Sequence, residues 1–158
     1  MRILVVDDNE HVRRGVLNIL ASETAWEVCG QAKDGEEAIR KARELLPDLV
    51  LLDISMPGMN GLEVTRILRR EVAKVKILIM SQHDPSQILP RALEAGAQGC
   101  VDKGNLATDL LPRIQSIMRP RLNPGTESAR STFHVPVPWN AIIPSQPCQR
   151  EQGSALRF

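Results

Sequence analysis

Short apolar runs alternate along this chain with longer stretches in which apolar residues recur every three or four positions. The runs predict five strands, at residues 2–6, 27–31, 49–52, 76–80 and 99–102. The first, third and fourth are almost entirely aliphatic, which is typical of strands covered on both faces. The stretches between and after them predict helices at residues 11–22, 36–46, 61–71, 85–94 and 108–118. This alternation predicts an α/β domain with a parallel sheet.

Residues at the predicted helix ends refine these limits. Asp34 followed by Glu37 resembles a capping box for the second helix. Asp84 is placed to cap the fourth helix, with Pro85 at its first position and Gly96 at its end. Pro90 lies inside that helix, so we expect either a kink or a helix that becomes regular only near Pro90.

A second proline, Pro112, lies inside the predicted fifth helix. Pro112 is tolerated there if Thr108 is the cap, because the first four N–H groups of a helix lack helical partners anyway. We therefore expect Leu106 and Ala107 to lie in a loop.

The composition changes near Met118. Six of the eleven prolines follow it, among Ser, Thr, Gln and Arg and without helical periodicity. We expect one domain at residues 1–118 and a disordered or extended Pro-rich tail at residues 119–158. A segment without amphipathic helices supplies no recognition helix, so we expect no specific DNA binding by this chain.

The overall composition excludes several classes of protein. The 158 residues carry a formal net charge of +1, and aromatic residues make up 3% with no Tyr, which argues against a nucleic-acid mantle and base-stacking platforms. No apolar run is long enough to cross a membrane, and the N-terminus lacks the features of a signal peptide, so we expect a cytoplasmic protein. The three widely spaced cysteines fit neither a disulfide framework nor a zinc site.

Polar residues stand where the predicted strands end. Asp7 and Asp8 follow the first strand, Asp53 the third, Ser81 the fourth, and Lys103 comes just after the fifth. Ligands of such sheets bind at the carboxyl ends of the strands. We therefore expect three carboxylates, one hydroxyl and one ammonium to converge at one edge.

Clustered carboxylates repel one another unless some are protonated or a cation lies among them, and oxygen ligands favour a hard ion such as Mg²⁺. Taken alone, Asp7 and Asp8 could equally form a solvated turn or cap the following helix. Ser81 could satisfy a turn, and Lys103 could be an ordinary surface lysine. The combination of four strand ends with complementary chemistry favours a magnesium site.

These residues resemble a known family. The matching segments are Val5-Val6-Asp7-Asp8, Asp34-Gly35, the run from Asp53 to Gly61, Ala92 to Ala97, and Lys103. In order and spacing they resemble the receiver domain of bacterial two-component response regulators, over about three quarters of the chain. The resemblance implies a flavodoxin-like five-stranded sheet in the order 2-1-3-4-5 with five flanking helices.

The resemblance also implies roles for individual residues. Asp53 would be the phosphoacceptor, receiving a phosphoryl group from a histidine kinase or phosphotransfer protein. Asp8 would bind Mg²⁺ directly and Asp7 largely through water, with Asp53 and the backbone carbonyl of Ser55 as further ligands. Lys103 and Ser81 would contact the phosphoryl group after transfer. Phosphorylation would then bias the surface formed by the fourth helix, the fifth strand and the fifth helix, and so alter partner binding.

One departure from the family pattern affects this switch. Receivers usually carry Tyr or Phe three residues before the lysine, and here that residue is Cys100. A thiol packs as a small apolar group but cannot swing a ring across the surface. We expect the output face to shift less than in ordinary receivers. A redox role for Cys100 is an alternative, although only Lys103 lies nearby in sequence to lower its pKa.

Two other functions remain open. The chain could be the amino-terminal part of a DNA-binding regulator, since similar receivers precede helix-turn-helix domains. It could also be a Mg²⁺-dependent phosphohydrolase that forms an aspartyl-phosphate, but such enzymes place a second acid where Ser55 stands. We therefore expect a signalling module rather than an enzyme, one that catalyses only its own phosphorylation and dephosphorylation. It could form a homodimer and would not associate with a membrane.

Overall fold

The computed structural model describes residues 1–72 and 74–119, and the predicted Pro-rich tail lies outside them almost entirely. The strands are the five that the sequence predicts, two of them unchanged and three extended by one residue. Their bounds are β1 Arg2–Val6, β2 Glu27–Ala32, β3 Leu49–Asp53, β4 Lys76–Ser81 and β5 Gly99–Asp102.

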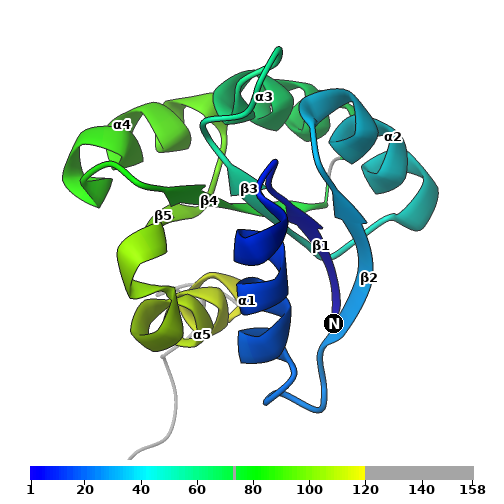
Figure 1. The fold of residues 1–158 in the computed structure, drawn as a ribbon. Coiled ribbons are helices and arrows are strands. Elements are labelled where there is room, and N and C mark those ends of the chain that lie inside the picture. The colour runs from blue at the N-terminus through cyan, green and yellow to red at the C-terminus, as the bar shows by residue number, and fades with distance from the viewer. Residues whose placement is uncertain (73, 120–158) are drawn as a thin grey trace, which may run out of the picture. The chain divides into compact units, whose positions relative to one another are not determined.

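The strands form one parallel sheet in the order β2-β1-β3-β4-β5 (Figure 1). β1 pairs with β3 through Val6 and Leu52, and β4 pairs with β5 through Ser81 and Asp102. This order confirms the predicted flavodoxin-like fold, in which the chain reverses direction across the sheet between β1 and β3. The carboxyl ends of all five strands therefore lie along one edge.

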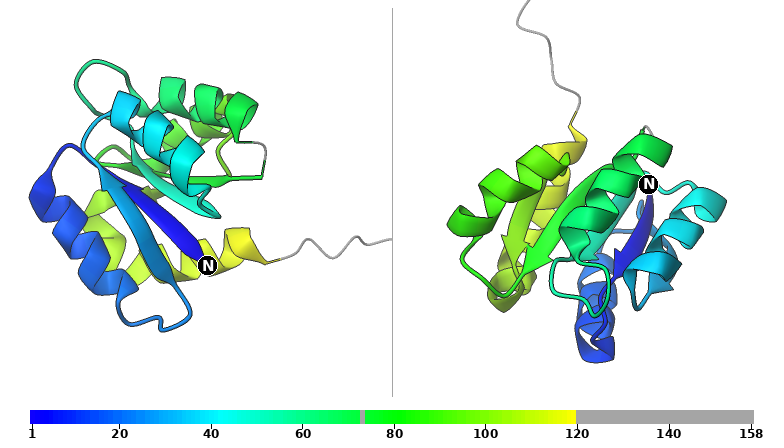
Figure 2. Two further views of the ribbon diagram at one scale, coloured as in Figure 1. Left: turned by 90° about the vertical axis from the view of Figure 1, so that its right-hand side faces the viewer. Right: turned by 90° about the horizontal axis from the view of Figure 1, so that it is seen from above.

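Five α-helices cover both faces of the sheet. They are α1 Glu10–Leu20, α2 Gly35–Leu45, α3 Gly61–Glu71, α4 Pro85–Ala95 and α5 Leu106–Met118, with a short 3₁₀ helix at Lys103–Asn105. Helices α2, α3 and α4 lie on one face, and α1 and α5 lie on the other (Figure 1). The views in Figure 2 show the same three layers from the side and from above.

The apolar strands explain this layering. Side chains alternate between the two faces of a strand, so a strand with helices on both sides is apolar throughout. In β1, Leu4 and Val6 pack in the core beneath α2, α3 and α4, whereas Ile3 and Val5 pack with residues of α1 and α5. All four side chains are fully buried.

The helix caps agree in part with the sequence predictions. Asp34 accepts a hydrogen bond from the N–H of Glu37 at 2.8 Å, but the Glu37 carboxylate bonds the N–H of Lys33 instead of completing the box. Gly96 ends α4 with a φ of 103°, a conformation that favours glycine. A reciprocal capping box occurs at α3, between Asn60 and Glu63, where we did not predict one.

One prediction about the helices was wrong, and one of the two alternatives in another is excluded. α5 begins at Leu106, so Leu106 and Ala107 are helical and Thr108 is not the cap. Pro112 is therefore beyond the first turn, where it removes a helical hydrogen bond. α4 is helical from Pro85, with the N–H groups of Gln87 and Ile88 already donating to Asp84, so a helix that becomes regular only near Pro90 is excluded. A kink at Pro90 stays a prediction.

Among residues 1–72 and 74–119, no helix has the length and apolar character needed to cross a membrane. This finding agrees with the short apolar runs in the sequence.

Candidate functional site

Asp7, Asp53 and Lys103 meet at the carboxyl edge of the sheet. Asp7 follows β1, Asp53 is the last residue of β3, and Lys103 follows β5. The Lys103 Nζ lies 2.6 Å from Asp7 Oδ2 and 2.9 Å from Asp53 Oδ1. Asp7 is fully buried, and the side chains of Asp53 and Lys103 are only 2% and 8% exposed. One ammonium thus bridges two buried carboxylates.

The buried cluster holds two carboxyl groups and one ammonium, and their interactions affect the pKa values of Asp7 and Lys103. Burial raises the pKa of Asp7, an effect only partly offset by its contacts with Lys103 and the N–H of Asn9. Burial on its own would lower the pKa of Lys103, but the two carboxylates outweigh that effect, so the pKa lies above its ordinary value. Lys103 therefore stays protonated near neutral pH.

Asp8 adds a third carboxylate at the exposed rim of the same cluster. Asp7, Asp8 and Asp53 can each offer one oxygen, and these oxygens lie within 4.8 Å of one another. Apart from the nearby ammonium, no hydrogen-bond donor among the described residues reaches the buried Asp7 Oδ2. An all-oxygen set with excess negative charge suits a hard divalent cation such as Mg²⁺. These residues therefore fit a metal site.

Local hydrogen bonds fix the orientation of both buried carboxylates. Asp7 Oδ1 accepts from the N–H of Asn9 at 2.9 Å, and Asp53 Oδ1 accepts from the N–H of Ser55 at 3.1 Å. Asp53 Oδ2 accepts no hydrogen bond from the described residues. One oxygen of Asp53 is thus held in place while the other remains available.

Ser81 and Ser55 lie at the same edge of the sheet but make fewer interactions with the cluster. Ser81 is the buried last residue of β4, and its Oγ accepts from the N–H of His83 at 3.0 Å. No hydrogen bond between Ser81 and Asp53 occurs among the described residues. Ser55 is exposed and meets the cluster through its N–H, and its carbonyl makes no described hydrogen bond.

Sequence reasoning missed one contributor to this edge. The Arg13 guanidinium, on the second turn of α1, donates to the backbone carbonyls of Asp7 and Asp8. The only signal in the sequence is an arginine placed one turn after an Asp-Asp-Asn segment.

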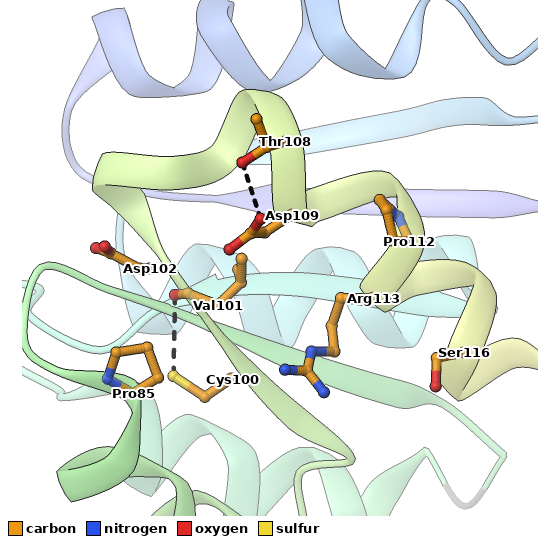
Figure 3. A pocket seen from close by; sticks show the side chains of 9 residues that line it. All are labelled: Pro85, Cys100, Val101, Asp102, Thr108, Asp109, Pro112, Arg113 and Ser116. Atoms are coloured by element: carbon orange, nitrogen blue, oxygen red, sulfur yellow. Dashed lines mark hydrogen bonds between the residues drawn. The ribbon is translucent and has the colours of Figure 1, made fainter.

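A groove of about 330 Å³ lies on a different part of the molecule, between the start of α4, β5 and α5 (Figure 3). Cys100 is buried at its base, and Pro85, Pro112 and Arg113 are among the residues around it. The Cys100 Sγ lies 3.9 Å from the carbonyl oxygen of Val101. Burial raises the pKa of the Cys100 thiol, which favours a packing role over a reactive one.

Comparisons with known proteins agree with this geometry. The family model described as the response regulator receiver domain matches residues 3–115. The response regulator GacA of Pseudomonas viridiflava is 41% identical over 117 residues, which are 74% of this chain and 55% of that protein. The response regulator UvrY of Escherichia coli K12 is 38% identical over 117 residues, 74% of this chain and 54% of that protein. The chain spans about half the length of these curated relatives.

Solved structures show the same fold. The signal receiver domain of the putative response regulator NarL from Mycobacterium tuberculosis gives a TM-score of 0.68 at 34% identity, covering 73% of this chain and 93% of that one. A LuxR family two-component response regulator from Aurantimonas sp. SI85-9A1 gives 0.70 at 37% identity, covering 73% and 83%.

Proposed function

Because this chain belongs to the response regulator receiver family, we propose that Asp53 accepts a phosphoryl group from a histidine kinase or phosphotransfer protein. The observation that carries the proposal is the state of the Asp53 carboxylate. Its Oδ1 is held by Lys103 and Ser55, and its Oδ2 has no partner among the described residues. A carboxylate oriented in this way is suited to attack phosphorus in line with the departing group.

The transfer forms a bond between an Asp53 oxygen and phosphorus and breaks the bond between phosphorus and the imidazole nitrogen of the donor. The incoming phosphoryl group is an anion that approaches three carboxylates, so its charge needs compensation. Receiver domains generally bind Mg²⁺ at acidic residues, and Asp7, Asp8 and Asp53 would hold the ion here, with the Ser55 carbonyl as a further ligand. When bound, Mg²⁺ neutralises charge on the phosphoryl oxygens.

Lys103 and Ser81 act on the phosphorylated product. Phosphorylation adds about −1.5 to −2 charge at Asp53, so the Lys103 ammonium gains an acceptor stronger than a carboxylate alone. The Ser81 Oγ accepts from the N–H of His83, which leaves its O–H group to donate to a phosphoryl oxygen on Asp53. Ser81 and Asp53 end neighbouring strands at the same edge of the sheet. Lys103 and Ser81 would draw their loops toward Asp53 and alter the surface that partners bind.

Receiver domains are in general not enzymes that turn over a separate substrate, and we infer that this chain catalyses only its own phosphorylation and dephosphorylation. We expect it to act in the cytoplasm through a protein partner. A second candidate, the amino-terminal part of a DNA-binding regulator, is compatible with the relatives, because the aligned segment makes up only about half of their length.

The proposal is tested by incubating the chain with acetyl phosphate and Mg²⁺ and measuring its intact mass. We expect the addition of one phosphoryl group, its loss in Asp53→Asn, and its loss in the presence of EDTA. Asp109→Asn is the matched control, because Asp109 is an exposed carboxylate on α5 whose one hydrogen bond among the described residues is accepted from Thr108. Equal labelling of the Asp53→Asn variant would exclude Asp53 as the acceptor, and undiminished labelling in EDTA would exclude the metal.

A further inference from the structure

The side chain of Arg13 returns from α1 to the segment that carries two of the three carboxylates. Its Nη1 lies 2.8 Å from the carbonyl oxygen of Asp7 and 3.4 Å from that of Asp8. The side chain is half-buried, and no ion pair of Arg13 occurs among the described residues. The guanidinium thus donates to the backbone carbonyls of Asp7 and Asp8 and not to their carboxylates.

Asp7 and Asp8 differ in how firmly they are held. The N–H of Asp7 donates to the carbonyl of Ala32 at 3.1 Å, and its carboxylate accepts from Asn9 and contacts Lys103. Asp8 is exposed, and its single hydrogen bond within the described residues is the one that Arg13 donates. Asp8 is therefore the least constrained residue of the carboxylate cluster. Among the described residues, only Arg13 forms a hydrogen bond with it.

We propose that Arg13 is a positioning residue that holds the Asp7-Asp8 segment in the conformation that binds a divalent cation. A ligand that is already oriented loses less conformational freedom when the ion binds, so the ion binds more tightly. Groups that orient metal ligands without contacting the metal typically contribute 10- to 100-fold in affinity. This inference rests on the proposed function, because it assumes that the cluster holds Mg²⁺.

The neighbouring residue on the same helix provides a matched control. Arg14 has the same side chain and lies on the same helix, but it is exposed, and within residues 1–72 and 74–119 its one ion pair is with Glu10, at 2.6 Å. Exposed ion pairs of this kind contribute little to stability. A change of charge near the site or a loss of helix propensity would affect both variants, whereas loss of the contact with Asp7 and Asp8 affects only Arg13.

The experiment titrates Mg²⁺ into the full chain by isothermal titration calorimetry, with the wild type, Arg13→Ala, Arg13→Lys and Arg14→Ala. We expect the dissociation constant to rise about tenfold in Arg13→Ala. Arg13→Lys is expected to give an intermediate value, because the lysine ammonium can donate to backbone carbonyls as Arg13 Nη1 does but stands on a shorter side chain. Arg14→Ala is expected to match the wild type.

Thermal unfolding of each variant is followed by circular dichroism in EDTA. These melts verify that each variant is folded at the titration temperature, so a change in Mg²⁺ affinity is not caused by unfolding. Unchanged Mg²⁺ affinity in folded Arg13→Ala, or an equal loss in Arg14→Ala, would overturn the positioning role and leave the proposed function intact. A wild type that binds no Mg²⁺ would overturn both. Tighter binding by Arg13→Lys than by the wild type would also contradict the role of the two-carbonyl contact.

Discussion

At the scale of single residues, the backbone of Asp53, the proposed phosphoacceptor, packs against a residue that has no side chain. Gly61, the first residue of α3, packs against the end of β3, and its N–H donates to the carbonyl of Ile54 at 3.0 Å. A Cβ built on Gly61 would lie 2.2 Å from the carbonyl oxygen of Asp53 and 2.8 Å from the Cα of Ile54. Both atoms belong to the backbone, so the neighbour cannot give way by a side-chain rotation.

We expect Gly61→Ala to lower the free energy of unfolding by about 1–3 kcal/mol, the usual cost of overpacking. The atoms that must move carry Asp53, so the variant should also be phosphorylated more slowly by acetyl phosphate. Urea unfolding and intact-mass kinetics measure the two effects separately.

Gly15→Ala is the control for this substitution. Gly15 lies in the interior of α1, and a Cβ there meets nothing within 4 Å. Alanine in a helix interior is favoured over glycine by about 0.5–1 kcal/mol, so this variant should be more stable than the wild type. Equal stability of the two variants would show that α3 moves away from Asp53 at little cost.

The sequence predicts the buried members of the site better than the residues around them. Asp7, Asp53 and Lys103 each follow an apolar strand, and a parallel sheet places such residues at one edge. The contact of Arg13 with Asp7 and Asp8 depends on a long side chain folding back along α1, and no periodicity in the sequence encodes that conformation.

At the scale of secondary structure, α2 shows how its first turn is stabilised by charge. Glu37 Oε2 accepts from the N–H of Lys33 at 3.0 Å, and Oε1 lies 2.8 Å from the Lys41 Nζ. The hydrogen bond with Lys41 and the one with the Lys33 N–H lower the pKa of Glu37. A carboxylate near a helix N-terminus is also favoured by the helix dipole.

Glu37→Gln should therefore lower the stability at neutral pH by about 0.5–1 kcal/mol. Because the pKa of Glu37 is lower in the folded than in the unfolded protein, its contribution is present above the ordinary glutamate pKa of 4.5 and is lost as the pH falls through the folded value. Urea unfolding from pH 7 downward should show the two proteins converging on the acid side of pH 4.5.

Glu44→Gln separates this effect from a general loss of negative charge on α2. Glu44 pairs with Arg40 at 3.1 Å, but both side chains are more than half exposed. Its replacement should change the stability little at any pH. A difference between Glu37→Gln and the wild type that stayed constant down to low pH would contradict a role for the ionised carboxylate.

The order and type of these elements follow from the sequence, but some of their ends do not. Thr108 was predicted to cap α5, yet a 3₁₀ turn at Lys103–Asn105 leads directly into that helix. Asn105 precedes α5 without capping it, because its side-chain amide donates to Asp102 Oδ2 at 2.8 Å. The hydrogen bond between Asn105 and Asp102 belongs to the loop that positions Lys103. The helix propensities of the residues do not predict it.

At the scale of the whole molecule, the carboxylate cluster and the groove beside Cys100 are joined through β5. Lys103 follows this strand directly, and Cys100 and Val101 within it line the groove. In ordinary receivers an aromatic residue at the position of Cys100 would respond to movement at the site. A buried thiol lacks a ring that could exchange between an inward and an outward position.

We therefore expect phosphorylation to alter the loops at the site more than the helices of the output face. Hydrogen exchange of backbone amides, measured with and without beryllofluoride and Mg²⁺, should show increased protection in the loops that follow Asp53, Ser81 and Asp102. Changes should be small across α4 and α5, where Pro90 and Pro112 themselves have no amide to report.

Cys100→Tyr tests whether the missing ring causes this restriction. Cys100 lines a groove of about 330 Å³, into which an aromatic side chain at this position can extend. The variant should show larger protection changes across α4 and α5 than the wild type when beryllofluoride and Mg²⁺ bind, because the ring can then couple the site to the output face. Large changes across α4 in the wild type would mean that the backbone of β5 transmits the signal without an aromatic residue, and that this receiver switches its output face in full.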